Sequence, residues 1–377
     1  MKLKFPGVYF GGKSAIAAQV WERLGNPPNY VEPFCGSAAV LLARPQSHCV
    51  DGRWPIETVN DINAWLCNVW RAIHADPDGV AAAADYPVSE LDIHARGDWL
   101  FYRPGVMEWV EKLRSDPAFY DVKSAAWWIW GNSCWIGDNW SRSTHNARHH
   151  QSGEAIGVVH AFPHLGDAGK GINRQRPHLG NASHGVSRQR PHLGDAGQGI
   201  NRKLPDPDGA DQIGDAITDT MQGRNLREYM RQLYQRTRGW RVCCGDWTRV
   251  LGETPTVIQG MTGVFLDPPY GVLDRDTCYG SDDSRDVATD VLRWCLENGD
   301  NPLLRIALCG YAGEHDELER HGWDVLHWKG RKGYGSQRKD SVNENRKRER
   351  IWFSPACSKP IWLLNLSREG QLCQPAV

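Results

Sequence analysis

The chain alternates strand-like and helix-like segments in two blocks, one before residue 77 and one after residue 223. In the first block, β-like segments at 29–34 and 57–60 are each followed by a helix-like segment, at 37–43 and 64–74. Parallel strands need a crossover of about helix length between them, so this alternation is typical of a mostly parallel α/β sheet. We therefore expect an α/β fold.

The alternation returns in the second block. Its expected elements are helix 226–238, strand 241–244, strand 263–266, helix 284–297, strand 303–308, helix 314–321 and strands near 325–328 and 350–353. The first of these helices is amphipathic, with apolar residues at helical spacing. The two blocks together predict one interrupted α/β unit.

The interruption, from about 77 to 223, has a different character. Helix candidates rich in Trp come first, followed by a stretch rich in Gly, His, Asn and Arg with little apolar periodicity. This stretch repeats a 14-residue unit three times between Pro163 and Leu204: PHLGDAGKGINRQR, PHLGNASHGVSRQR and PHLGDAGQGINRKL. Each unit offers only two or three large aliphatic side chains for burial, so the units are expected to be loop-like, stacked on one another or ordered by a partner.

Composition limits the partners and the compartment. The chain has 44 Lys and Arg against 45 Asp and Glu, so a polyanion would have to meet a local patch. The 11 Cys form no CxxC pair, and Cys243 and Cys244 are adjacent, which is poor geometry for zinc or for a disulfide framework. The sequence shows neither a leader nor an apolar run of about 18 residues, so we expect a cytoplasmic protein without a membrane span.

Histidines recur within the repeats at the 14-residue period, as His164, His178 and His192. A second type of metal ligand does not accompany them, and we expect no metal.

The strongest motif is Asp267-Pro268-Pro269-Tyr270, directly after the apolar run that ends at Leu266. This order places a carboxylate and an aromatic ring at the carboxyl edge of a sheet, where ligands of α/β folds bind. An exocyclic aromatic amine is a weak nucleophile, so a catalyst must hold its protons with acceptors and aim its lone pair. Asp267 and the Pro268 carbonyl suit that task, and Tyr270 would stack on an extruded base. The alternative is a type I turn with Tyr270 as a lid on the core.

A second motif, Glu32 to Ser37, also follows a strand and opens a helix. Its small-residue turn would let a ligand approach backbone N–H groups at the helix start. Asp61 ends the next strand about 25 residues later, where α/β folds bind ribose hydroxyls. An ordinary strand-to-helix turn and a helix N-cap at Asp61 are the alternatives.

Five motifs occur in a fixed order: FGGK at 10–13, EPFCGS at 32–37, NDIN at 60–63, GDW at 245–247 and DPPY at 267–270. In this order, and with an insertion before GDW, the chain resembles the Dam-type (class alpha) N6-adenine DNA methyltransferases over roughly 4–75 and 224–355. The resemblance implies a Rossmann-like S-adenosylmethionine-dependent methyltransferase sheet with an inserted target-recognition region. It also implies methyl transfer to the N6 amine of an adenine flipped out of double-stranded DNA.

The resemblance assigns site residues. It implies catalytic roles for Asp267, Pro268, Pro269 and Tyr270. It implies cofactor binding by Tyr9, Phe10, Gly12, Lys13, Glu32, Pro33, Phe34, Cys35, Gly36, Asp61, Asp246 and Trp247. In this scheme Asp61 binds the ribose, Asp246 holds the adenine amine of the cofactor, and Trp247 replaces a phenylalanine.

The chain also departs from the family. Its turn has fewer glycines than the common FxGxG, with Ser37 after Gly36 and an unusual Cys35. Residues 130–137 faintly resemble the recognition stretch of the family, whereas the repeats have no counterpart, so no target sequence is implied.

Domain bounds follow from these observations. We expect the methyltransferase domain at 1–76 and 224–355, the inserted target-recognition region at 77–223 with repeats at 163–204, and a C-terminal tail at 356–377.

Two basic segments are expected to contact DNA phosphates. Residues 329–350 hold nine Lys and Arg against three acidic residues, and the repeats hold seven against two. The residues assigned to DNA are Arg174, Arg176, Arg188, Arg190, Arg202, Lys329, Arg331, Lys332 and Arg338. The alternative is that each charge run is a solvated loop.

Other functions fit parts of the same pattern. The same geometry would methylate cytosine N4 or an RNA adenine, although the Asp of DPPY favours adenine by resemblance. A nucleic-acid-binding relative without catalysis would keep the same residues. A dinucleotide oxidoreductase is disfavoured because no GxGxxG follows the first strand. A restriction endonuclease partner and a prophage or plasmid origin are implied by the resemblance alone.

Overall fold

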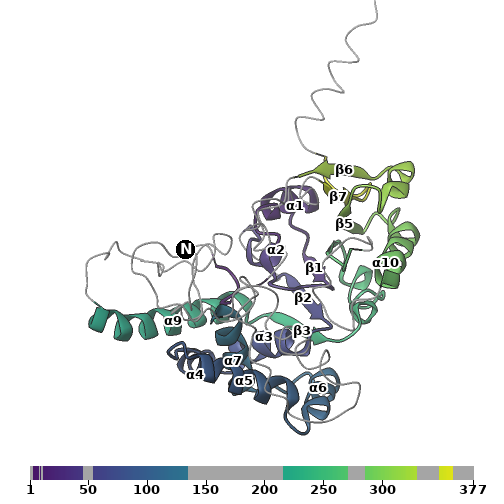
Figure 1. Ribbon diagram of the computed structural model, residues 1–377. Helices are drawn as coiled ribbons and strands as arrows, with labels where there is room; N and C mark the ends of the chain where they lie inside the picture. The colour runs from purple at the N-terminus through teal and green to yellow at the C-terminus, as the bar shows by residue number, and fades with distance from the viewer. Residues whose placement is uncertain are drawn as a thin grey trace, which may run out of the picture.

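The computed structural model describes residues 3–7, 9, 12–45, 54–134, 215–270, 285–328 and 348–359. These residues form a mixed α/β structure around a seven-stranded sheet with strand order β3-β2-β1-β4-β5-β7-β6 (Figure 1). The strands are β1 Asn29–Glu32, β2 Ile56–Asp61, β3 Trp240–Cys244, β4 Thr262–Leu266, β5 Leu304–Tyr311, β6 Asp324–His327 and β7 Glu349–Phe353.

Strands β1 to β5 run parallel to their neighbours, whereas β7 lies antiparallel between β5 and β6. This is a Rossmann-like α/β sheet, mostly parallel, as the sequence predicts. The antiparallel edge could not be read from the sequence, because alternation along the chain does not say which strands pair.

Helices cover both faces of the sheet. The α-helices are α1 Ala17–Leu24, α2 Ala39–Leu42, α3 Ala64–Ala75, α4 Pro77–Ala84, α5 Glu90–Tyr102, α6 Val106–Ser115, α7 Val122–Cys134, α9 Asp215–Thr237 and α10 Arg285–Asn298. The short 3-10 helices are η1 Trp247–Val250, η2 Val257–Gln259 and η4 Asp316–His321.

The core has two layers because successive residues of a strand point to opposite faces. On one face, Val264 packs with residues of η1, α10 and η4, such as Trp247 and Val291. On the other face, Phe265 packs in a cluster that includes Trp21 of α1 and Met230 of α9. Burial on both faces explains why these strands are apolar runs and do not alternate with polar residues.

Four helices from the start of the expected insertion form a group beside the sheet. In Figure 1, α4 to α7 lie together below β3, and α9 runs along them. The closest packing is of α7 on α3 and α4, and of α4 on α9. The buried Arg71 of α3 ties this group to the sheet, since its guanidinium donates to the carbonyls of Leu113, Asp116 and Val242.

Three of the differences from the expected element boundaries have a local cause. The helix expected at 37–43 is only α2, because Ala38 adopts a left-handed φ of 49° directly before it. The expected helix 314–321 is the 3-10 helix η4, enclosed by Gly313 at φ 90° and Gly322 at φ 77°. β1 ends at Glu32 because the next residue, Pro33, has no N–H to donate.

The repeats and the segment 329–347 lie outside the described residues. Within the described part, no helix is long and apolar enough to cross a bilayer.

Candidate active site

A pocket opens at the carboxyl edge of the sheet, where the strand order reverses between β1 and β4. It encloses about 810 Å³ of empty space, part of it continuous with solvent. It is lined by Tyr9, Gly12, Lys13, Glu32, Pro33, Phe34, Cys35, Gly36, Ser37, Ala39, Val40, Asp61, Ile62, Gly245, Asp246, Trp247, Phe265, Asp267, Pro269 and Val287. Open α/β sheets bind ligands at this reversal.

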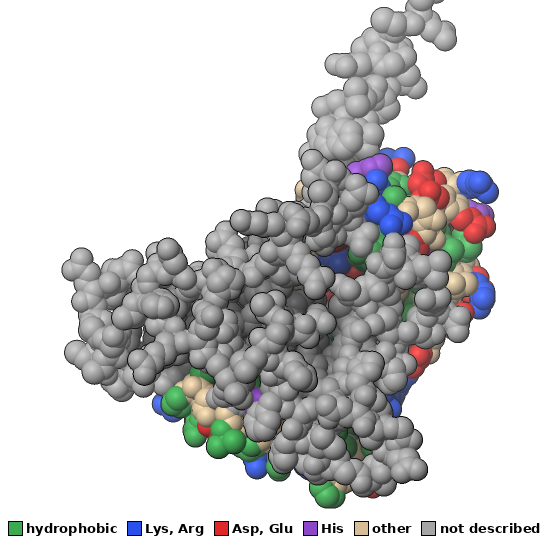
Figure 2. All heavy atoms as spheres, in the orientation of Figure 1, with side chains coloured by type: hydrophobic (Ala, Val, Ile, Leu, Met, Phe, Trp, Pro, Cys, Tyr) green, Lys and Arg blue, Asp and Glu red, His purple; other side chains and the backbone are tan. Residues whose placement is uncertain are grey.

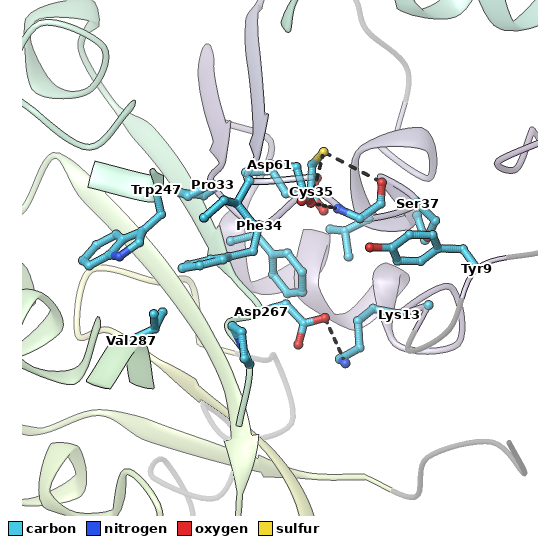
Figure 3. A pocket seen from close by; sticks show the side chains of 18 of the residues that line it. Tyr9, Lys13, Pro33, Phe34, Cys35, Ser37, Asp61, Trp247, Asp267 and Val287 are labelled. Atoms are coloured by element: carbon cyan, nitrogen blue, oxygen red, sulfur yellow. Dashed lines mark hydrogen bonds and ion pairs between the residues drawn. The ribbon is translucent and has the colours of Figure 1, made fainter. Parts of the chain in front are cut away.

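The turn after β1 forms one wall of the pocket. Gly36 adopts φ 47°, and a Cβ on it would lie 2.8 Å from the Tyr9 ring. Glycine is therefore required here both by the backbone and by the close approach of Tyr9. The Gly36 N–H donates to Asp61 Oδ2 at 2.9 Å, which links the turn to the end of β2 (Figure 3).

Asp61 is held on both sides. Its Oδ1 accepts the Asn63 N–H at 2.9 Å, while Oδ2 accepts the Gly36 N–H. Burial raises the pKa of this carboxyl group to about 6, against the effect of these backbone donors. Asp61 does not cap α3, because the N-cap is Asn63, whose side chain accepts the Leu66 N–H. The carboxylate therefore faces the pocket as a fixed acceptor.

Asn60 is a residue of the site that the sequence reasoning did not single out. Its Nδ2 donates to the Pro33 carbonyl at 3.0 Å and to the Gly245 carbonyl at 2.9 Å. It thereby joins the turn after β1 to the segment after β3. Its place in NDIN, directly before Asp61, was the available signal.

Two aromatic rings stack on each other in the part of the pocket next to Asp246. Phe34 and Trp247 are stacked with ring centroids 5.9 Å apart and planes 28° apart (Figure 3). Beside them, Asp246 Oδ1 accepts the Thr248 N–H at 2.9 Å and so caps η1. This part combines apolar faces with one exposed carboxylate.

Lys13 and Asp267 form an ion pair in the near part of the pocket. Lys13 Nζ lies 2.9 Å from Asp267 Oδ2, and the side chains are 8% and 20% exposed (Figure 3). Burial alone would lower the pKa of Lys13, but the Asp267 carboxylate and other nearby acidic groups outweigh it and raise this pKa. Lys13 therefore balances the charge of Asp267.

Tyr270 lies next to this pair. Its hydroxyl donates to Asp267 Oδ1 at 3.2 Å, and Lys13 Nζ lies 5.3 Å from the centre of its ring. Burial and the Asp267 carboxylate hold the pKa of the Tyr270 hydroxyl well above its ordinary value, so it stays protonated and donates. Both oxygens of Asp267 thus contact donors from within the protein.

Glu32 is buried at the end of β1. Its Oε2 accepts the Tyr30 hydroxyl at 3.0 Å, and burial raises the pKa of Glu32 well above its ordinary value despite this hydrogen bond. The Asp267 carboxylate acts in the same direction. Glu32 is therefore biased towards its neutral form, in which it also carries a proton to donate.

The structure brings most of the expected site residues together. Among those assigned to the cofactor, all the described ones line the pocket, and Phe10 lies outside the described residues. Asp267 and Pro269 line it, whereas Pro268 is buried behind it and Tyr270 reaches Asp267 from the side. The residues assigned to DNA, in the repeats and in the segment 329–338, also lie outside the described residues.

Some lining residues were missed. Ala39, Val40, Phe265 and Val287 carry no chemical signal in the sequence, and Ser37, Ile62 and Gly245 were noted only as parts of the EPFCGS, NDIN and GDW motifs. Val287 comes from α10, far from any motif, so only the packing of that helix places it here.

Comparison with known proteins agrees with the geometry. Residues 9–142 match the family model of the D12 class N6 adenine-specific DNA methyltransferases. The matched range contains the turn after β1 and Asp61, whereas Asp246 and Asp267 lie beyond it. No curated protein matches the chain.

Proposed function

We propose that the chain is an N6 adenine-specific DNA methyltransferase of the D12 class, whose family model matches residues 9–142, and that its pocket binds S-adenosylmethionine and presents an extruded adenine to Asp267. Methylation of DNA adenine at N6 is the activity of this family. The observation that carries the assignment of the site is the placement of Asp267 in the same pocket as Asp61 and the glycine turn.

The pocket residues fit this cofactor. Asp61 would accept hydrogen bonds from the ribose hydroxyls, and Asp246 would accept one from the adenine amine. Phe34 and Trp247, which stack on each other, would offer an apolar surface against which the adenine ring packs. The absence of a side chain at Gly36 lets the Tyr9 ring pack directly against the turn as a wall of the pocket. When bound, S-adenosylmethionine supplies an electrophilic methyl group.

Asp267 would act on the target base. Its carboxylate would accept an N–H of the adenine amine, which holds the amine in place and turns its lone pair towards the methyl donor. The amine enters a position now contacted by Lys13 and by the Tyr270 hydroxyl, so it must share or replace one of these donors. Tyr270 would stack on the extruded base.

The segments that we assign to DNA contact are taken from the sequence. The described surface in Figure 2 shows Lys, Arg, Asp and Glu side chains intermixed around β6, without a gathering of one sign. We assign phosphate contact to the repeats and to the basic segment 329–350, and target recognition to 77–223, as the sequence predicts. A restriction endonuclease blocked by this methylation is the partner that we propose.

The central test is Asp267→Asn, which keeps the size of the side chain and removes its charge. We expect methyl transfer from labelled S-adenosylmethionine to unmethylated DNA to fall by several orders of magnitude, while cofactor affinity changes only a few-fold. The matched control is Asp290→Asn, a surface residue paired with Arg293. Digestion of the product to nucleosides should show N6-methyladenine. Because the amide oxygen of Asn can still accept an N–H, Asp267→Ala is measured as well. Near-normal turnover in Asp267→Ala, with the control unaffected, would show that this motif is not the catalytic centre.

A second test concerns the arginines of the repeats. Replacing Arg174, Arg176, Arg188, Arg190 and Arg202 with Gln should weaken binding similarly on two unrelated duplexes. The slope of log affinity against log salt should flatten by about 0.9 for each phosphate that the variant no longer neutralises. Arg293→Gln, at an exposed residue of α10, is the control. An unchanged slope would mean that the repeats do not contact phosphates, and weaker binding on one duplex alone would mean that they read bases.

A further inference from the structure

Tyr311 is the last residue of β5 and lies beside the Asp267–Tyr270 segment. β5 pairs in parallel with β4, and the last pair is Leu308 opposite Leu266. Continuing this register for three residues beyond the pair places Tyr311 level with Pro269, which follows the end of β4. The rings of Tyr311 and Tyr270 meet edge to face, with centroids 4.6 Å apart and planes 71° apart. No sequence motif surrounds Tyr311, so only the fold brings it to the site.

Tyr311 is held firmly by its surroundings. Its backbone N–H donates to Glu314 Oε2 at 2.9 Å, and the next residue, Ala312, donates its N–H to the Arg348 carbonyl of the neighbouring chain segment at 2.7 Å. The Arg348 guanidinium lies 5.4 Å from the centre of the Tyr311 ring. Tyr311 is only half-buried and lies at the carboxyl end of β5, so its ring contributes little to the hydrophobic core.

Tyr270, in contrast, follows the end of its strand and needs outside contacts to fix its ring. Its hydroxyl donates to Asp267, and Lys13 Nζ lies 5.3 Å from the centre of its ring, but a hydrogen bond at one end and a point charge over one face do not fix the tilt of the ring. The edge of a second aromatic ring sets that plane, because edge-to-face contact has a preferred geometry. A ring stacks on the incoming base only if the plane of the ring is parallel to the plane of the base.

We propose that Tyr311 is a positioning residue that holds the Tyr270 ring in the plane in which it stacks on the target adenine. This inference rests on the proposed function, since it needs Tyr270 to stack on the base. Tyr311 acts through Tyr270 and does not need to touch the base. Its ring, and not its hydroxyl, is the part that positions Tyr270.

A double-mutant cycle tests this. Tyr311→Ala, Tyr270→Ala and the double variant are compared with the wild type by single-turnover methylation of unmethylated DNA, with DNA affinity measured separately by fluorescence anisotropy. We expect Tyr311→Ala to slow methyl transfer by roughly 2- to 10-fold, the range of an edge-to-face contact, and to leave DNA affinity within about 2-fold. In the Tyr270→Ala background the same substitution should have almost no further effect.

Two control variants separate positioning from folding. Tyr311→Phe keeps the ring and should restore the rate to within about 2-fold of the wild type. Tyr120→Ala removes an exposed tyrosine outside the site and should leave the rate unchanged. Thermal unfolding of each variant shows whether the rate follows stability, which a purely structural role would require.

The failures are distinguishable. If Tyr270→Ala is slow while Tyr311→Ala is as fast as the wild type, or if the two rate reductions multiply in the double variant, the positioning role is wrong and the stacking role stands. If Tyr270→Ala itself turns over normally, the stacking role is wrong and Tyr311 has nothing to position. A rate reduction in Tyr311→Phe equal to that of Tyr311→Ala also overturns the inference, because it would assign the effect to the hydroxyl.

Discussion

At Asp61, burial and ligand binding act on the same carboxylate. Burial raises its pKa to about 6, so in the free protein it is ionised above that pH and increasingly protonated below it. Ribose hydroxyls donate best to the ionised form. Cofactor affinity should therefore be constant above about pH 7 and fall below pH 6.

The dissociation constant of S-adenosylhomocysteine, measured by calorimetry between pH 5 and 8, checks this. If only the ionised form of Asp61 binds the ligand, the dissociation constant should increase by up to roughly tenfold for each pH unit below the pKa. Asp61→Asn should bind more weakly at pH 7.5 and show little of this dependence. A wild-type affinity that is flat down to pH 5 would show that Asp61 does not hold the ligand.

Single residues were predictable from the sequence where their chemistry is distinctive. Asp61 and Asp267 could be selected because each carboxylate ends a strand, and such ends meet at one edge of a parallel sheet. The ion pair of Lys13 with Asp267 and the contact of Tyr311 with Tyr270 could not be derived, because they depend on side-chain orientation after packing. The functional roles assigned to these residues remain predictions.

At the scale of elements, the turn between β1 and α2 is the most constrained segment of the site. Gly36→Ala would place a Cβ at φ 47°, which costs an L-residue about 1 to 2 kcal/mol, and would push against the Tyr9 ring. We expect lower thermal stability and weaker cofactor binding. Gly239→Ala is the matched control, because a Cβ there meets nothing within 4 Å.

A further variant separates the two causes. In the Tyr9→Ala background the clash is removed and only the backbone cost remains, so Gly36→Ala should have a smaller effect there. Equal effects in both backgrounds would assign the whole destabilisation to the backbone. No effect in either would contradict the requirement for glycine.

Elements were predictable where burial is simple. β4 and β5 are apolar runs because both of their faces are covered, and α9 carries apolar residues at helical spacing from Leu226 to Leu233. The predictions of helix type and length were wrong where residues with positive φ interrupt the helix, as at Ala38 and on either side of η4. Strand order was not predicted, because it depends on which faces pack across the whole molecule.

At the scale of the whole molecule, two buried histidines should make stability depend on pH. Burial lowers the pKa of His74 and of His315 from 6.5 to about 4. Between these values the unfolded chain binds more protons than the folded one, so stability falls as pH decreases from 6.5 to 4. The decrease is roughly 3 kcal/mol for each residue.

His315→Phe isolates one of these contributions. The His315 ring packs edge to face on Trp352, and within the described residues neither ring nitrogen has a hydrogen-bond partner, so Phe is a close replacement. Relative to the wild type, the variant should gain stability in urea unfolding as pH falls from 6.5 to 4.5. Asp61 has the opposite dependence in part of this range, and the comparison cancels it. The exposed His321→Gln should show no such gain; if it gains as much as His315→Phe, burial is not the cause.

The pairing of β1 with β4 has a consequence for biosynthesis. β1 is central in the sheet, yet Asn29 pairs with Thr262, which follows 233 positions later. At about 5 to 20 residues per second, a ribosome needs on the order of 10 to 50 seconds to deliver the missing neighbour. During that interval one edge of β1 lacks the strand that completes it in the native sheet. The emerging polypeptide is thus exposed to mispairing, and its yield should depend on translation speed and chaperones.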